Sequence, residues 1–321
     1  TTTIEVLTKG WSKAVGLIYY IKQHNYNSED ILFIGDAIFP GGNDYSVFEK
    51  DIKCIKVNGP QDTEIILEKI LLQDSTPKSD NPIAYFSMEY ALDHNPLMYA
   101  GGLGVLSGDY LLQASKDKVP LIAFGLKYSD APPDDFFELK DKNGNIVHIS
   151  IPIEQGIVKA KVWQRNIDKD GIVKLYLFDT DVKENNEFDK KITRNLYDPI
   201  FLSRLKQQIV LGIGSIKLIK YLEINPSIYH LNEGHTSFVG FAILNEMPIS
   251  ECTKIVGTKH TILPESGLFI KYIDLKNILE QYCNNNKKDI NNLFDMGKYE
   301  GDPELFSTTK FLMKISVRSN G

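Results

Sequence analysis

Polar residues near the start of the chain have the types and spacing that could hold a phosphate group. Lys13 closes the run Lys-Gly-Trp-Ser-Lys, Asp36 follows an apolar stretch, and Asn43 and Asp44 lie on the glycine-bearing loop after it. A carboxylate at the carboxyl end of a parallel strand lies where open α/β sheets bind ligands. The oxygens of Asp36, Asn43 and Asp44 suit magnesium, and Lys13 could neutralise a phosphate. The alternative is that Asp36 and Asp44 cap a turn and Lys13 is a surface lysine, but turn capping needs neither two glycines nor an Asn-Asp pair.

A glycine cluster farther along the chain could approach an anion. Gly101, Gly102 and Leu103 belong to the run Ala-Gly-Gly-Leu-Gly, which precedes a predicted helix. Glycines let the backbone come close to a ligand, and the N–H groups at a helix start attract negative charge. Glycines that pack in a tight turn would explain the cluster equally well.

Two further polar groups follow apolar runs that are typical of strands. Asn232, Glu233 and His235 end one run, and His260 ends another. Their side chains offer donors and acceptors for sugar hydroxyls. One histidine and one glutamate two residues apart are poor support for a metal site, and a single histidine is often structural. Because the carboxyl ends of parallel strands share one edge, His235 and His260 could still line a common cleft.

The periodicity of apolar residues predicts α/β folding in both halves of the chain. In the front part Ser12 is expected to cap a helix, and a polar, proline-bearing stretch at 73–82 predicts a linker between a segment at 1–72 and one at 83–321. In the second part Ser107 is a candidate helix cap, and the Asn- and Lys-rich stretch at 284–292 is expected to be a solvated loop. The expected strands cover residues 31–34, 52–57, 83–86, 120–128 and 226–231, with hairpin strands in 144–179, and the expected helices cover residues 62–72, 107–116 and 200–222.

Composition excludes several classes of protein. The chain has 321 residues, of which 42% are hydrophobic and 24% are charged, so it can bury a substantial core. Lys and Arg number 36 against 42 Asp and Glu, a net charge of −6, which disfavours nucleic acid and anionic membranes as partners. No apolar run reaches the roughly 18 residues of a membrane span. Three widely spaced cysteines and the lack of a signal peptide predict a cytoplasmic location.

The front motifs resemble a known superfamily. The runs KGWSKAVGL and GDAIFPGGND, within residues 1–72, are similar to the C-terminal part of haloacid-dehalogenase-superfamily enzymes. The closest branch is that of sugar-phosphate phosphatases and eukaryotic-type phosphomannomutases. The resemblance implies that Lys13 contacts phosphate, that Asp36 binds Mg²⁺ and that Asn43 and Asp44 support it. The nucleophilic aspartate of that family lies in a DxDxT motif, which this chain lacks, so the half-site is expected to be inert as written.

The second part resembles the N-terminal half of α-glucan phosphorylases. Six motifs occur in family order over about residues 82–321: YFSMEY, YAGGLGVLSGDYLLQASKDKVPLIAFGLKY, LYLFDTDVKEN, RLKQQIVLGIG, YHLNEGHTSF and KHTILPE. The resemblance implies a Rossmann-like N-terminal domain of a two-Rossmann-domain glycosyltransferase fold, preceded by the partial haloacid-dehalogenase-like α/β segment. It also implies α-1,4-glucan and inorganic phosphate as partners, and pyridoxal phosphate as cofactor. Family members are commonly dimers, so a homodimer is expected.

The same resemblance assigns roles to the second set of residues. Gly101, Gly102 and Leu103 would form the loop beside the substrate phosphate and the glucosyl unit. His260 would contact the transferred glucose, and Glu233 and His235 would lie by the glucan subsites, next to Asn232.

The chain also departs from the family pattern. The Arg-Leu-x-Gln-Glu pattern ends here in Gln208, and Ser215 replaces a glycine. The lysine that binds the cofactor lies in the family's C-terminal half, so the chain appears as an excerpt of a longer parent and is expected to be inactive alone. Two alternatives to a phosphorylase stay open. One is a non-catalytic glucan-binding subunit that pairs with a second chain, and the other is sugar-phosphate phosphatase or mutase activity from the front module in the parent protein.

Overall fold

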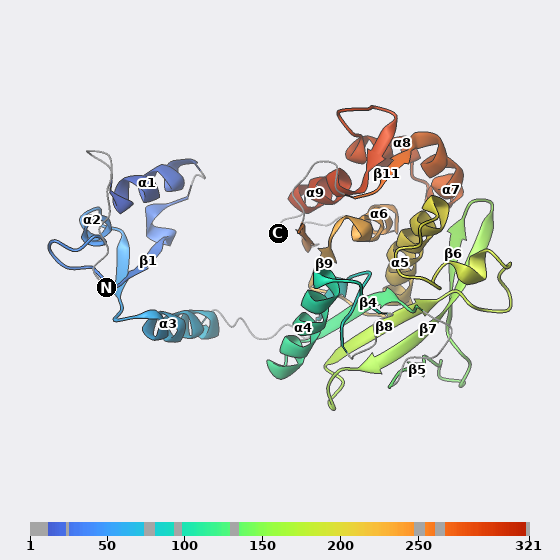
Figure 1. The fold of residues 1–321 in the computed structure, drawn as a ribbon, viewed down its shortest axis with the longest axis horizontal. Coiled ribbons are helices and arrows are strands. Elements are labelled where there is room, and N and C mark those ends of the chain that lie inside the picture. Colours follow the sequence, from blue (N-terminus) through green and yellow to red (C-terminus); the bar gives the residue numbers. More distant parts are fainter. Residues whose placement is uncertain are drawn as a thin grey trace. The chain divides into compact units, whose positions relative to one another are not determined.

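The chain divides into two units, one at residues 1–78 and one at 79–321 (Figure 1). The boundary lies inside the stretch that the sequence predicts as a linker. Each unit is described by itself below as the front unit and the second unit. The computed structural model describes residues 12–23, 26–73, 81–92, 98–128, 135–246, 254–260 and 267–318.

The front unit pairs two short parallel strands with helices, as the periodicity predicts. Strand β1 pairs with β2 in a register that joins Leu32 to Lys53. Ala14, Ile21, Val47 and Ile52 form its small core. Its elements are α1 (Lys13–Gln23), η1 (Ser28–Asp30), β1 (Leu32–Gly35), α2 (Tyr45–Phe48), β2 (Lys53–Lys56) and α3 (Pro60–Gln73).

The predicted cap of the first helix is confirmed. The hydroxyl of Ser12 accepts a hydrogen bond from the Val15 N–H at 3.4 Å, which satisfies one of the free donors at the start of α1. Of the apolar residues Val15, Leu17, Ile18 and Ile21 in this helix, Ile21 is buried, while Val15 is 37% exposed. The helix therefore contributes a narrower stripe to the core than its sequence suggests.

The second unit is built on an eight-stranded sheet in the order β10-β9-β3-β4-β8-β7-β5, with β6 paired to β7. The first five strands in this order run parallel to one another. Strand β7 is antiparallel to its three partners β8, β6 and β5. Hairpin strands are present within 144–179 as expected, and Gly144 and Gly171 lie in turns with positive φ. The strands are β3 (Ile83–Phe86), β4 (Leu121–Leu126), β5 (Phe137–Glu138), β6 (His148–Ile153), β7 (Gly156–Asn166), β8 (Val173–Asp179), β9 (Ile228–Asn232) and β10 (Lys254–Thr258).

Helices cover both faces of this sheet. Helix α4 (Gly102–Lys116) lies on the face of the sheet that carries the side chain of Tyr85. The Tyr85 hydroxyl lies 3.0 Å from Ser107 Oγ on this helix. Helix α5 (Phe201–Tyr221) packs by Gly214 against Phe178. Tyr85 shares its face with Leu175 through the strand register, and Phe178 is three residues farther on. Because side chains alternate along a strand, α4 and α5 lie on opposite faces.

The order of the strands creates a switch point beside β3. The chain passes from β3 to β4 and β8 on one side, and then returns through α5 to β9 on the other side of β3. Open α/β sheets bind ligands at such a reversal, beyond the carboxyl ends of the strands. The residues that follow β3, β9 and β10 are therefore the ones to examine for a site.

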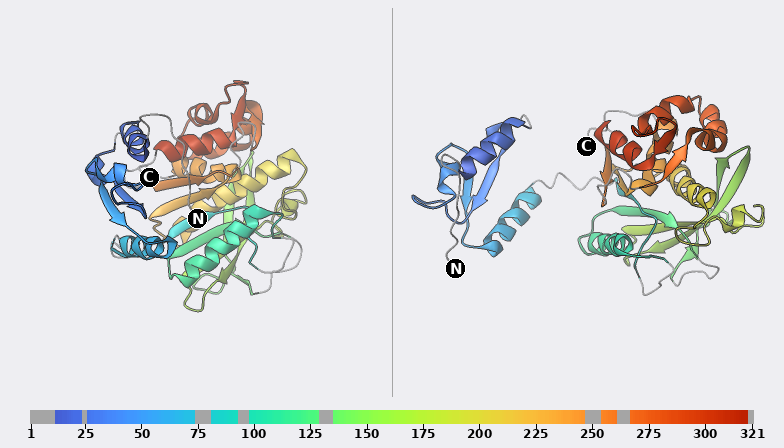
Figure 2. Two further views of the ribbon diagram at one scale, coloured as in Figure 1. Left: turned by 60° about the vertical axis from the view of Figure 1, so that its left-hand side comes forward. Right: turned by 45° about the horizontal axis from the view of Figure 1, so that its top comes forward.

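The C-terminal part forms a layer of helices beside β10. Helix α9 (Thr308–Arg318) packs against α6 (Ser237–Glu246) and β10. In both views of Figure 2 the orange-red helices of residues 272–318 stay together on one side of the second unit. Within the described residues, none of the helices combines the length and apolar character needed to cross a bilayer. The remaining elements are η2 (Asp189–Lys191), η3 (Gly234–Thr236), α6 (Ser237–Glu246), β11 (Phe269–Lys271), α7 (Tyr272–Asn285), α8 (Ile290–Gly297), β12 (Leu305–Ser307) and α9 (Thr308–Arg318).

One local prediction is wrong, and another is confirmed only in part. Helix α4 begins at Gly102, with Gly101 in extended conformation before it, so Ser107 lies in the second turn and is buried rather than being a cap. Within the stretch at 284–292, residues 286–289 form the predicted loop between α7, which runs to Asn285, and α8, which starts at Ile290 and is capped by Asp289. The loop is shorter than the sequence predicts because both helices extend into the stretch.

Replacing Gly212 with alanine tests the close contact of α5 with α6. An ideal Cβ at Gly212 would lie 2.3 Å from the carbonyl carbon of Phe238, so the helices must separate. Overpacking costs roughly 1–3 kcal/mol, and we expect the upper end, measured by urea unfolding, because the clash is with backbone. Gly214→Ala is the control, since its nearest neighbours are side-chain ends at 3.3–3.5 Å, and it should change stability by less than about 1 kcal/mol. Equal stability of the two variants would contradict the close contact of α5 with α6 at Gly212.

Candidate functional site

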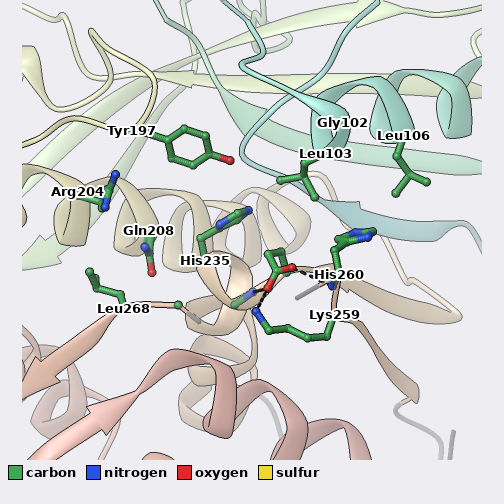
Figure 3. A pocket seen from close by; sticks show the side chains of 13 residues that line it. Gly102, Leu103, Leu106, Tyr197, Arg204, Gln208, His235, Lys259, His260 and Leu268 are labelled. Carbon is green, nitrogen blue, oxygen red and sulfur yellow. Dashed lines mark hydrogen bonds and ion pairs between the residues drawn. The ribbon is translucent and has the colours of Figure 1, made fainter. Parts of the chain in front are cut away.

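A cavity of about 690 Å³ opens at the carboxyl ends of β9 and β10 (Figure 3). Its wall combines the start of α4, one face of α5 and the segments that follow the two strands. It is lined by Gly102, Leu103, Leu106, Tyr197, Arg204, Gln208, Glu233, Gly234, His235, Lys259, His260, Gly267 and Leu268. The structure thus brings the glycine loop, Glu233, His235 and His260 to one cavity.

Asn232 lies buried behind this wall and orients His260. Its Nδ2 donates to the Tyr85 hydroxyl at 2.8 Å and to Ser107 Oγ at 3.2 Å, and its Oδ1 lies 2.8 Å from His260 Nε2. Because Nδ2 is the donor, Oδ1 accepts, and the His260 ring carries a proton on Nε2. The Nδ1 atom of His260 is then available as an acceptor for a ligand.

The carboxylate of Glu233 binds Lys259 and His260, the two residues that follow the end of the neighbouring strand β10. Its Oε2 accepts from the His260 N–H at 2.9 Å, and its Oε1 accepts from the Gly234 N–H at 3.1 Å and from Lys259 Nζ. Burial would raise the pKa of Glu233, but the bonds from Lys259 and the two N–H groups outweigh it and lower that pKa. The carboxylate is therefore ionised at neutral pH and fully engaged, which favours a positioning role over contact with the reacting atoms.

The backbone of Glu233 is strained. It has φ 72° and ψ 165°, a region that is essentially reserved for glycine and costs about 1–3 kcal/mol for other residues. A glutamate persists there because its carboxylate joins β9 to the end of β10. Strain of this kind is concentrated at functional sites.

Glu89, which follows β3, fastens the glycine loop. Its Oε2 accepts from the Ala100 N–H at 2.7 Å and the Gly101 N–H at 3.3 Å, and its Oε1 accepts from the Tyr197 hydroxyl. Burial, together with Glu89, raises the pKa of Tyr197 far above its usual value, so Tyr197 remains a donor. The glycine loop is therefore held in place by the hydrogen bonds that its backbone N–H groups donate to Glu89.

Packing does not explain all the glycines of this loop. A Cβ at Gly104 would meet Tyr99 at 2.3 Å, and one at Gly108 would meet the Ala91 carbonyl at 2.2 Å, so these two glycines are required by close contacts. A Cβ at Gly101 or Gly102 would meet nothing within 4 Å. Close packing thus explains Gly104 and Gly108. Gly101 and Gly102 instead leave open space beside the cavity.

His235 comes from η3 and faces the α5 side of the cavity. Burial lowers its pKa to about 4, so the ring is neutral at physiological pH. Its Nε2 is buried and lacks a hydrogen-bond partner among the residues that the structure describes. Its ring centroid lies 5.9 Å from that of Tyr197.

A second cavity of about 770 Å³ adjoins the first and shares Leu106 and His260 with it. Asn232 and His230 line it, and His230 Nε2 lies 2.7 Å from Thr258 Oγ1. Burial lowers the pKa of His230 to about 4, so it too is neutral at physiological pH. His260 consequently lies at the border of two hollows that are both large enough for a sugar ring.

In the front unit the structure joins Lys13 to Asp44. The Lys13 Nζ lies 2.7 Å from Asp44 Oδ1, and Asp44 Oδ2 accepts from the Ala37 N–H at 3.0 Å. Asp36 and Asn43 are exposed. Asp44 thus ties its loop together, as the structural alternative proposed, and it also meets the lysine expected at the phosphate.

Magnesium does not fit the front residues as they stand. Both oxygens of Asp44 are occupied, which leaves Asp36 and Asn43 as ligands. Across the described parts of the chain, no group of three or more His, Cys, Asp or Glu side chains is placed to hold a metal ion. The magnesium site stays a prediction, and the metal alternative for Asn232, Glu233 and His235 gains no support.

Sequence reasoning missed five residues that surround the cavity: Glu89, Tyr197, Arg204, Gln208 and Lys259. Two of them carried a signal in their positions. Glu89 follows a buried parallel strand just as Glu233 does, and Lys259 directly precedes His260. Arg204 and Gln208 are one helical turn apart on α5, but nothing local shows that this face meets the end of β9.

The fold is similar to that of a Rossmann-like glycosyltransferase catalytic domain. The catalytic domain of starch synthase IV from Arabidopsis thaliana, solved with ADP and acarbose, matches with a TM-score of 0.56 at 16% identity. The match covers 74% of this chain and 44% of that one. At this identity the likeness shows the fold alone, and it confirms the predicted fold class.

The sequence relatives include glucan phosphorylases. Maltodextrin phosphorylase of Thermococcus litoralis is 38% identical over 186 residues, which cover 51% of this chain and 22% of that protein. Glycogen phosphorylase of Aquifex aeolicus is 34% identical over 245 residues, 62% of this chain and 35% of that protein. Residues 1–73 match the family described as eukaryotic phosphomannomutase. The chain is thus similar to glucan phosphorylases over most of its length, behind a phosphomannomutase-like front, and it spans well under half the length of these two relatives.

Two substitutions at Glu233 separate its strain from its contacts. Glu233→Ala and Glu233→Gly both lose the bonds to Lys259 and His260, but only glycine relieves the strained φ. We expect the glycine variant to be more stable than the alanine variant by about 1 kcal/mol in urea unfolding. An alanine variant as stable as the glycine variant would show that the backbone at this position is unstrained.

Acid should loosen the front unit through Asp44. Burial would raise the pKa of Asp44, but the bonds from Lys13 and Ala37 outweigh it and hold that pKa below 3.8. A lowered pKa stabilises the fold above 3.8 and loses this contribution as the pH falls below it. The protection factors of the β1 amides, which correct for the intrinsic pH dependence of hydrogen exchange, should therefore fall below about pH 4 in the wild type and change less with pH in Asp44→Asn. Asp36→Asn, at an exposed carboxylate, is the control, and identical pH profiles for wild type and Asp44→Asn would contradict the ion pair.

Proposed function

We propose that the second unit binds the ends of α-1,4-glucans and forms the glucan-facing part of an α-glucan phosphorylase. That enzyme cleaves glycogen or maltodextrin ends with inorganic phosphate to give glucose 1-phosphate. The observation that supports the proposal is the connected set Asn232, Glu233, Lys259 and His260, which is held by hydrogen bonds at the rim of the cavity. The similarity to maltodextrin and glycogen phosphorylases supports the same function.

His260 is the residue of this set that meets the sugar. Asn232 fixes the side chain through Nε2, and Glu233 fixes the backbone through the N–H, so His260 Nδ1 can accept from a glucose hydroxyl without further ordering. Preorganisation of this kind lowers the entropic cost of binding. Lys259, neutralised by Glu233, contributes no net charge to this side of the cavity, which suits a neutral substrate.

The start of α4 is the place for the phosphate. The Gly104 and Val105 N–H groups bond back to Gly101, and the Gly101 N–H is taken by Glu89. The N–H groups of Gly102 and Leu103 lie at the open first turn, where a helix attracts anions. The empty space beside Gly101 and Gly102 permits the close approach that such contacts require.

The described residues do not fit pyridoxal phosphate, the cofactor that the resemblance implies. Lys259 is the lysine among the residues that line the cavity of about 690 Å³, and its ammonium group is engaged by Glu233. A Schiff-base lysine must be free to lose its proton. No step of the reaction is therefore assigned to the cofactor through the residues of this chain.

The front unit carries a second candidate function. The match of residues 1–73 to eukaryotic phosphomannomutase and the pairing of Lys13 with Asp44 support a role on sugar phosphates. In this proposal Lys13 exchanges its partner Asp44 for the phosphate of the ligand. Together the two units would handle glucose 1-phosphate in sequence, one releasing it and the other converting it. A coupled assay of the full protein tests this, and an absence of both conversion and dephosphorylation of glucose 1-phosphate would remove it.

Replacing His260 with alanine tests the glucan site. The loss of one hydrogen bond to a sugar hydroxyl should weaken maltotriose binding roughly three- to tenfold in isothermal titration calorimetry. His148→Ala, at an exposed histidine on β6, should bind like the wild type. A wild-type chain that binds no maltotriose would contradict the proposal. Binding that never leads to glucose 1-phosphate, even in a protein that includes the cofactor-bearing half, would favour the non-catalytic glucan-binding subunit.

A further inference from the structure

A buried network of hydroxyl groups lies behind His260. Ser87, Ser107 and Asn232 are fully buried, and Tyr85 is 1% exposed. Because solvent does not reach these side chains, they satisfy their donors and acceptors within the protein. Ser107 Oγ is at the centre of the network, within 3.2 Å of a polar atom of each of the other three side chains.

The hydrogen of the Ser107 hydroxyl is directed away from Asn232. Two acceptors lie 2.9 Å from Ser107 Oγ, namely Ser87 Oγ and the Leu103 carbonyl oxygen, and a hydroxyl has one hydrogen to donate. Ser107 Oγ therefore accepts from its other two neighbours, the Tyr85 hydroxyl at 3.0 Å and Asn232 Nδ2 at 3.2 Å. Burial raises the pKa of Tyr85 to about 12, so its hydroxyl keeps the hydrogen that it donates.

This arrangement leaves one orientation for the Asn232 amide. Its Nδ2 donates to the Tyr85 and Ser107 hydroxyl oxygens, because both of these oxygens accept. Its Oδ1 then faces His260 Nε2 at 2.8 Å, and only a protonated Nε2 forms a hydrogen bond with it. If the amide were turned over, Oδ1 would accept from Tyr85 and Nδ2 would face Nε2. A ring with one proton would then carry it on Nδ1.

We propose that Ser107 is a positioning residue that determines which nitrogen of His260 carries the proton, through the orientation of the Asn232 amide. The proposal rests on the proposed glucan function, in which His260 Nδ1 accepts from a glucose hydroxyl. With Ser107 in place, Nδ1 is an acceptor before the sugar binds. Ser107 also bonds the carbonyl of Leu103, and Leu103 and His260 both line the cavity (Figure 3). One buried hydroxyl therefore holds the first turn of α4 and the sugar-facing ring.

Replacing Ser107 with alanine tests this assignment by NMR. Alanine favours helix, so α4 should stay intact. Without Ser107 Oγ the Tyr85 hydrogen lacks an acceptor unless Asn232 turns its Oδ1 toward it. We therefore expect the Nε2–H tautomer in the wild type, and ring-nitrogen chemical shifts that move toward the Nδ1–H tautomer in Ser107→Ala. Spectra are recorded at about pH 8.5, where an ordinary histidine carries one ring proton. The His260 signals are those that His260→Ala lacks.

Two further variants are the controls. Tyr85→Phe removes a hydroxyl from the same network, but it also removes the hydrogen that would attract Asn232 Oδ1, so its tautomer should match the wild type. Ser215→Ala removes a buried hydroxyl that has no partner among the residues that the structure describes, and it should also match. A shift in Tyr85→Phe as large as that in Ser107→Ala would show that any loss from the network suffices, which overturns the proposal.

Maltotriose binding connects the network to the glucan site. Ser107→Ala should raise the Kd of maltotriose about two- to threefold in isothermal titration calorimetry. In a His260→Ala background it should cause no further rise, since it acts through that ring. If the wild type carries its proton on Nδ1, or if Ser107→Ala keeps the wild-type tautomer, the proposal is wrong. If the tautomer shifts but neither Ser107→Ala nor His260→Ala weakens maltotriose binding, the positioning of the ring stands and the glucan function fails.

Discussion

The carboxylate of Glu233 joins the ends of two neighbouring strands, and the geometry of the cavity depends on it. The side chain reaches from the end of β9 to Lys259 and to the backbone of His260 beyond β10. It does so from a backbone conformation that glycine would adopt more easily. A salt bridge and two bonds from backbone N–H groups offset the strain. Removing the carboxylate would therefore release both His260 and Lys259.

The sheet brings these groups together because of the order in which its strands are laid down. The return of the chain from β8 to β9 places Asn232 beside Tyr85 and opposite the start of α4. The two walls of the cavity then differ in kind. The wall of Asn232, Glu233 and His260 has its hydrogen bonds satisfied within the protein, which fixes its shape. In the wall of Arg204 and Gln208, the buried Arg204 Nε and Gln208 Oε1 have no hydrogen-bond partner among the described residues.

The front unit shows how a sequence match and a site can differ. Its residues 1–73 match the family described as eukaryotic phosphomannomutase, and the resemblance predicts that Lys13 contacts phosphate. In the structure Lys13 and Asp44 neutralise each other, and Asp44 also holds its own loop through Ala37. A phosphate or a metal ion must displace one of these contacts, so the pair is both a brace of the fold and the point at which a ligand would compete.

The sequence by itself determined most elements and the two family resemblances. Apolar periodicity located the strands around β1, β3, β4 and β9 and the helices α3 and α5, because it reports which face of an element is buried. It also identified the polar residues at the ends of β9 and β10, since polar side chains directly after apolar runs mark the edge of a parallel sheet. It failed at Ser107, where packing outweighed local preference, and it made the loop within 284–292 too long.

Only the tertiary structure decided which side chains meet. Asn232 bonds Ser107 across 125 positions of sequence, and Tyr197 bonds Glu89 across 108. Gln208 could be read only as a departure from a pattern until its face of α5 was placed against η3. Local sequence encodes propensity and burial, whereas these partnerships arise from the winding of the sheet, which brings the ends of strands together from distant parts of the chain.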